Sequence, residues 1–198
     1  MQLAELKGDE ELFRESFGKY ALAVKYKKKM HEAYYNWGTA LSNLAELKGD
    51  EELFRESFEK YGKAWSIIKK LTRFDQPMMM NTGLRTVIGA YIVGKDDEAD
   101  HIFIELMGAL SKVVDLKAII PYFFTFFETL ANKAKIAGAR SYLEQLLSSR
   151  FKKELNALIP FRFLYEYLEH KDDAIIRRQP PEIQKVLNEM IKSMEKKA

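Results

Sequence analysis

Residues 3–17 read LAELKGDEELFRESF, and residues 44–58 repeat the same fifteen letters. The second copy begins 41 residues after the first, at position 44 instead of position 3. Self-similarity at a period of roughly 20 to 50 residues is the signature of a repeat array, in which each repeat is one supersecondary unit. Identity over the whole stretch exceeds what packing alone requires, so a recent natural duplication and an engineered duplication both remain open.

The composition favours helices and a core. The 198-residue chain has only ten glycines and five prolines, which leaves little material for loops. Its net charge of +3 is small for a nucleic-acid reader. The absence of cysteine excludes disulfides and thiolate chemistry, and it suggests a cytoplasmic location. We find no signal peptide, and the longest apolar stretch is about half of the ~20 residues needed to span a membrane.

The second copy predicts a turn between two helices. Gly49 suits the left-handed position that ends a helix, and Asp50 suits the N-cap of the next one. Apolar residues then recur in steps of four and three, as on one face of an α-helix: Phe54, Phe58, Tyr61, Trp65 and Ile68. The first copy predicts the same turn between two helices. The second of these helices is expected over residues 9–29, with a matching apolar face: Phe13, Phe17, Tyr20 and Val24.

The stretch between these helices, residues 30–48, is also spaced as a helix. Gly38 lies in its middle, where glycine costs about 1 kcal/mol relative to alanine. A glycine among large residues indicates that a neighbouring helix approaches closely there. A weak spot without a role is the alternative.

At this point the chain resembles the tetratricopeptide repeat (TPR) family. One set of residues matches the first helix of that repeat: Tyr34, Trp37, Gly38 and Leu41. Another set matches the second helix: Ser57, Phe58, Tyr61 and Ala64. The period here is seven residues longer than the family's 34, and seven residues are about two helical turns. Each helix of a hairpin can therefore gain about one turn without rotating its buried face.

The resemblance implies an all-α fold, a right-handed α–α superhelix of about ten helices. We expect one domain over residues 1–198, with TPR-like hairpins in residues 1–74 and degenerate hairpins in residues 75–198. Periodicity places later helices at residues 77–93, from 97 onward, at 139–148 and at 150–158. Pro121 and Pro160 each suit the first turn of an aromatic-rich helix. An amphipathic helix that begins near Pro180 is expected to cap the C-terminal end.

The family's first helices line a concave groove that accepts a peptide. Carried over by position, four residues are expected to face that groove: Tyr35, Thr39, Ser42 and Asn43. Family members that clamp a C-terminal carboxylate carry Lys or Asn at the positions of Tyr35 and Thr39, so we predict no such clamp. The sequence therefore predicts a non-catalytic scaffold or adaptor that binds a peptide or protein segment. The alternative is that these four are ordinary exposed helix residues.

The lysine clusters at residues 25–29 and 60–73 support an alternative function, a nucleic-acid-binding repeat protein. Lysines near a helix C-terminus also offset the helix dipole, which is the simpler explanation. We expect no metal site, since the three histidines are far apart in sequence: His31, His101 and His170. The sequence has no glycine-rich phosphate loop and no GxSxG nucleophile motif, so we also expect no enzyme activity and no cofactor.

The N-terminal end of the array suggests one further partner. The chain starts late in what should be the first helix of the first repeat, so one face of the helix at residues 9–29 is expected to be uncovered. A repeat array needs covered or polar ends. A homodimer formed through residues 1–30 would cover this face.

Overall fold

The structure is a computed structural model that describes residues 2–71, 75–110, 113 and 115–196, with only the backbone for residues 2–9. The described residues form ten α-helices and one 3-10 helix, and contain no strand. The chain divides into two compact units, Met1–Val113 and Val114–Ala198. The fold is therefore all-helical, as the sequence predicts.

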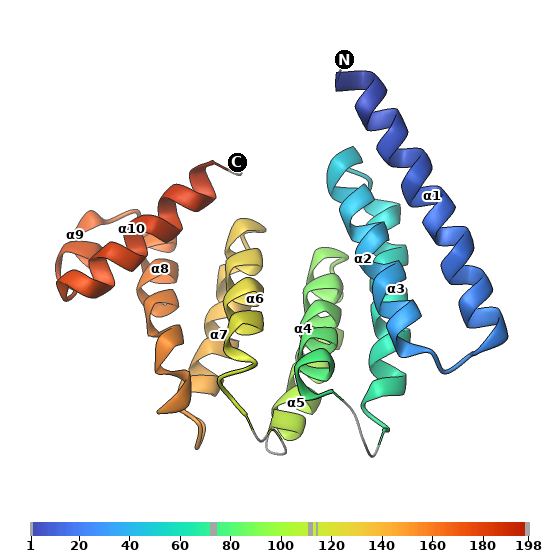
Figure 1. Cartoon of the computed structure of the whole chain (residues 1–198). Helices are drawn as coiled ribbons and strands as arrows, with labels where there is room; N and C mark the ends of the chain where they lie inside the picture. Colours follow the sequence, from blue (N-terminus) through green and yellow to red (C-terminus); the bar gives the residue numbers. More distant parts are fainter. Residues whose placement is uncertain (1, 72–74, 111–112, 114, 197–198) are drawn as a thin grey trace. The chain divides into compact units, whose positions relative to one another are not determined.

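The first unit holds five helices, and each packs against the next one along the chain (Figure 1). Their bounds are α1 Gln2–Tyr26, α2 His31–Lys48, α3 Glu51–Ile68, α4 Gln76–Ile92 and α5 Asp96–Leu110. The predictions for the second copy and for residues 77–93 are confirmed to within one or two residues. Asp75 caps α4 as its side chain accepts a hydrogen bond of 2.8 Å from the Met78 N–H group.

The turn in the second copy of the repeat has the predicted form. Gly49 ends α2 in the left-handed region, with φ of 64°. The Asp50 side chain then accepts hydrogen bonds from the N–H groups of Glu52 and Leu53, at 2.9 and 3.2 Å. These bonds satisfy two of the free donors at the start of α3.

The first copy folds differently, and the prediction that a helix starts at Asp9 is wrong. α1 begins at Gln2 and continues through Gly8 and Asp9 without a turn. A turn leaves helix-end groups unpaired and is stable only when the two helices that it joins pack together. In the second copy, α2 and α3 have 18 residues each for this packing. In the first copy the helical hydrogen bonds continue through Gly8 and Asp9.

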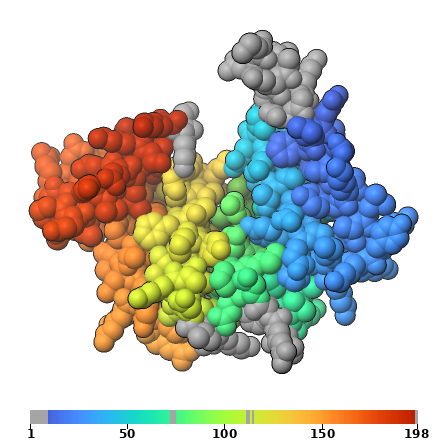
Figure 2. All heavy atoms as spheres, viewed as in Figure 1, coloured from blue at the N-terminus to red at the C-terminus, as the bar shows by residue number. Residues whose placement is uncertain are grey.

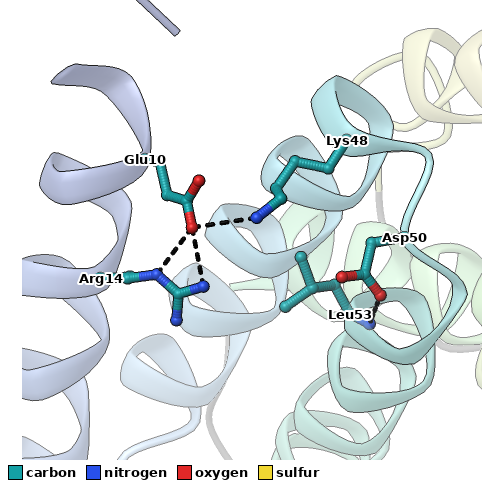
Figure 3. A network of polar contacts seen from close by, with 5 residues as sticks. All are labelled: Glu10, Arg14, Lys48, Asp50 and Leu53. Atoms are coloured by element: carbon teal, nitrogen blue, oxygen red, sulfur yellow. Dashed lines mark hydrogen bonds and ion pairs between the residues drawn. The ribbon is translucent and has the colours of Figure 1, made fainter. Parts of the chain in front are cut away.

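A polar network joins α1 to α2 (Figure 3). The Glu10 carboxylate accepts hydrogen bonds from Arg14 Nε and Nη2, at 2.9 and 2.8 Å, and from Lys48 Nζ at 3.0 Å. The hydrogen bonds from Arg14 and Lys48 lower the pKa of Glu10. In the second copy, Arg55 pairs instead with Glu52, at 3.8 Å. Identical residues thus have different partners.

The core of the first unit confirms the prediction for Gly38. The aromatic ring of Tyr61 packs on this glycine so closely that a Cβ atom there would lie 3.0 Å from Tyr61 Cδ1. The predicted apolar face of α3 is buried apart from Phe54, which is half-buried: Phe58, Tyr61, Trp65 and Ile68. Any side chain at position 38 would therefore require the Tyr61 ring to shift where α2 and α3 cross.

The second unit contains five α-helices and the 3-10 helix. Their bounds are α6 Ile120–Asn132, α7 Ile136–Leu147, η1 Glu154–Leu158, α8 Ile159–His170, α9 Asp173–Arg177 and α10 Pro181–Glu195. Pro121 and Pro160 lie in the first turns of α6 and α8, as predicted. Phe127 is central, since its ring contacts Phe161 and Tyr165 and its carbonyl oxygen accepts a hydrogen bond of 2.8 Å from the Tyr165 hydroxyl.

The predicted α-helix at residues 150–158 is wrong in part. The Ser149 hydroxyl donates to the Leu146 carbonyl at 2.7 Å and accepts from the Phe151 N–H at 3.2 Å, which closes the end of α7. A turn follows, and the 3-10 helix η1 then places Leu155 and Leu158 in the core. The last helix, α10, packs against α8 and α9, and Leu187 is its buried residue.

Candidate functional site

The four predicted groove residues all lie on α2, within the first unit. Tyr35, Thr39 and Ser42 are half-buried, and Asn43 is exposed. The Tyr35 hydroxyl accepts a hydrogen bond of 2.7 Å from Asn81 Nδ2 on α4. The Thr39 hydroxyl donates to the Tyr35 carbonyl at 3.1 Å. Two of the four residues therefore belong to a polar chain that links α2 to α4, and their role as groove residues stays a prediction.

Tyr61 of α3 also takes part in this hydrogen-bonded polar network. Its hydroxyl donates to Thr39 Oγ1 at 3.0 Å, and its ring makes an edge contact with the Tyr35 ring, with 5.6 Å between the centroids. Burial raises the pKa of Tyr61, and the hydrogen bond with Thr39 and the positive charge of Arg85 offset part of that effect. The Tyr61 hydroxyl therefore keeps its proton and holds Thr39 in place.

Sequence reasoning missed two residues of this surface, Asn81 and Arg85 on α4. They are four residues apart and both half-buried, so one face of α4 presents both side chains. Arg85 forms no ion pair within the ranges that the structure describes. Their spacing in the helix predicted at residues 77–93 was the available signal. We call Tyr35, Thr39, Asn81 and Arg85 the α2–α4 polar surface.

The α2–α4 polar surface presents hydrogen-bonding groups and one positive charge. Tyr35 and Asn81 offer donors and acceptors that are already positioned by each other. Arg85 adds a guanidinium group with five N–H donors, which suits a carboxylate or several carbonyl oxygens. Because its neighbours hold it half-buried, a ligand would meet Arg85 in a partly desolvated setting, where a charged hydrogen bond is stronger.

The two lysine clusters differ in their surroundings. Lys25, Lys27, Lys28 and Lys29 are all exposed, at the end of α1 and in the turn after it. In the second cluster, Lys60 Nζ lies 4.3 Å from the centre of the Trp37 ring, and Lys69 pairs with Glu105 at 2.7 Å. Arg73 lies outside the described residues. Lys60 and Lys69 of the second cluster thus have partners within the first unit. The nucleic-acid alternative stays a prediction.

The described histidines belong to three different helices, α2, α5 and α8, and each has one glutamate within 4 Å. In the part of the chain that the structure describes, no three His, Asp or Glu side chains gather closely enough to hold a metal ion. None of the described helices combines the length and the apolar character that crossing a membrane requires.

The chain matches no family model, no curated protein and no solved structure.

Proposed function

We propose that this protein is a non-catalytic scaffold or adaptor that binds an extended peptide segment of a partner protein on the α2–α4 polar surface. The observation that carries the proposal is Arg85, a half-buried guanidinium without an ion pair among the described residues, beside the hydrogen-bonded Tyr35–Asn81 pair. A peptide with an acidic side chain supplies the missing charge, and its backbone supplies further acceptors. Ser42 and Asn43 extend this surface along α2.

The proposed architecture is the TPR-like superhelix that the sequence resembles. Its support is that each helix of the first unit packs on the next one along the chain, with the most extensive packing between α2 and α3, which is compatible with successive hairpins α2–α3 and α4–α5. In such an arrangement α2 and α4 are the first helices of successive hairpins. Their shared surface is then the concave side, on which partner segments bind in helical-repeat proteins.

The experiment is a selection of random peptides displayed on phage against the full chain. The selected peptides are then measured by titration calorimetry with the wild-type chain and with Arg85→Glu. We expect enrichment of peptides with at least one acidic residue, and a loss of about tenfold or more in affinity in Arg85→Glu. The matched control is Lys63→Glu, an equal charge change at an exposed position of α3. It should bind like the wild type.

Two results would contradict the proposal. One is a selection that enriches no peptide with measurable affinity for the folded chain. The other is a set of selected peptides whose affinity is the same for Arg85→Glu as for the wild type. Circular dichroism of each variant confirms that the helices are intact.

A further inference from the structure

α1 and α3 carry the same four residue types on one face, three of them within the repeat and the fourth, a tyrosine, three residues after its end. The residues on α1 are Leu12, Phe13, Ser16 and Tyr20, and their counterparts on α3 are Leu53, Phe54, Ser57 and Tyr61. On α3 this face receives α2. On α1 it lines, together with Ala40 of α2, an open hollow of about 330 Å³. The molecule therefore shows one face both with and without a helix on it.

The pairing of α2 with α3 shows what this face binds. Gly38 leaves room for the ring of Tyr61, and a Cβ atom at Gly38 would lie 3.0 Å from that ring. The Ser57 hydroxyl donates a hydrogen bond of 2.8 Å to the Gly38 carbonyl oxygen. On α3 this face thus packs against an α-helix whose glycine lies over the Tyr61 ring. Leu41 and Ala45 of α2 continue the buried side of that helix.

The copy of this face on α1 has the features expected when the helix that packs on it is absent. The Ser16 hydroxyl donates back to the Phe13 carbonyl in its own helix, at 2.6 Å. Leu12 is 66% exposed. Tyr20 is half-buried, whereas its counterpart Tyr61 is 3% exposed. In Figures 1 and 2, α1 forms the edge of the first unit, and α2 is the helix that packs against it.

We propose that the face of α1 formed by Leu12, Phe13, Ser16 and Tyr20 binds a helix of a partner protein, one that carries glycine where α2 carries Gly38. The incoming glycine lies over the Tyr20 ring, and its carbonyl oxygen accepts the Ser16 hydroxyl in place of the Phe13 carbonyl. Apolar residues three and seven positions after the glycine, like Leu41 and Ala45, fill the hollow. This face does not use Arg85, so it and the α2–α4 polar surface can be tested separately.

The test uses a fluorescent peptide with the sequence of residues 31–48, which is α2 itself, and the full chain. The peptide is not expected to displace the chain's own α2, because an intramolecular helix has an effective concentration in the millimolar range. Fluorescence anisotropy should show saturable binding with one peptide per chain. A peptide with Gly38→Leu should bind about tenfold more weakly or worse, although leucine favours the helix more than glycine does.

Variants of the chain locate the binding. Tyr20→Ala should weaken peptide binding about tenfold. Tyr26→Ala, which removes a tyrosine of α1 that is 86% exposed, should leave binding unchanged. Thermal unfolding followed by circular dichroism shows whether each variant is folded. If Tyr20→Ala unfolds, Ser16→Ala is used instead and should weaken binding severalfold.

Three outcomes would overturn the inference. The first is equal binding of the wild-type and Gly38→Leu peptides. The second is binding that Tyr20→Ala and Ser16→Ala both leave unchanged. The third is absence of peptide binding. If the chain in that case sediments as a dimer that Tyr20→Ala dissociates, a second copy covers the face, and a partner helix does not.

Discussion

The Ser57 hydroxyl donates a hydrogen bond of 2.8 Å to the Gly38 carbonyl oxygen, which ties α3 to the middle of α2. Its counterpart in the first copy, Ser16, donates to Phe13 in its own helix. The residues that precede the two serines are the same over the whole repeat. Their different partners therefore come from tertiary packing alone, and the repeat supplies its own control for mutational tests.

The first prediction compares Ser57→Ala with Ser16→Ala. Both changes remove a hydroxyl from a helix and have the same effect on helix propensity. Only Ser57→Ala removes a bond between helices, so it should lower the free energy of unfolding by about 0.5–1.5 kcal/mol relative to Ser16→Ala. Urea unfolding followed by circular dichroism measures the difference. Equal stabilities of the two variants would show that the bond to Gly38 contributes nothing.

The second prediction is that replacing glycine by alanine has opposite effects on stability in the two copies of the Gly-Asp pair. Gly49→Ala places a side chain at φ of 64° and should destabilise the α2–α3 hairpin by about 1 kcal/mol. Gly8→Ala lies inside α1 and should increase helix content and stability, by up to about 1 kcal/mol. Thermal unfolding and the helical signal at 25 °C measure both. Destabilisation by Gly8→Ala would mean that the first copy also forms a turn.

Two further glycines test the crossing of α2 and α3. Gly38→Ala gains helix propensity, but its methyl group meets the Tyr61 ring, and overpacking of this kind costs about 1–3 kcal/mol. The net effect should be a loss of stability. Gly62→Ala on α3 meets no atom within 4 Å, so only the propensity gain of up to about 1 kcal/mol remains. If both variants were stabilised in thermal unfolding, the contact between Gly38 and Tyr61 would be looser than described.

The fourth prediction concerns pH and the carboxylate that joins α5 to α3. Burial tends to raise the pKa of Glu105, but hydrogen bonds from Lys69 Nζ at 2.7 Å and Trp65 Nε1 at 3.0 Å outweigh it and lower the pKa below 4.5. A carboxylate with a lowered pKa in the folded state stabilises the fold above its unfolded pKa. That stabilisation is lost as the pH falls through the folded pKa.

Glu105→Gln should therefore lower Tm at neutral pH, and the gap to the wild type should shrink as the pH falls below about 4.5. A series of melting curves between neutral and acidic pH measures this gap. Glu59→Gln is the control, because Glu59 is an exposed carboxylate without a described ion pair. Its Tm should follow the wild type throughout. A gap for Glu105→Gln that is constant with pH would contradict the assigned role of its charge.

Of the four residues of the α2–α4 polar surface, the sequence singled out Tyr35 and Thr39 and did not single out Asn81 and Arg85. Tyr35 and Thr39 were found because they occupy positions within the stretch that resembles a known repeat. Asn81 and Arg85 lie in a helix where that resemblance is faint, and a polar pair at a spacing of four is common on any exposed helix face. Only the packing of α4 against α3, and its hydrogen bond to Tyr35, brings them to the same surface.

Local signals in the sequence determined most helices, because a helix forms and ends through contacts within a few residues. Asp50 and Asp75 as N-caps, and the four-three spacing of apolar residues in α3, are signals of this kind. Whether a Gly-Asp pair makes a turn depended on tertiary structure. The same residues end a helix at Gly49, where α2 and α3 pack against each other across the turn, and continue a helix at Gly8. The packing of whole helices against each other, which no short stretch of sequence specifies, determines this difference.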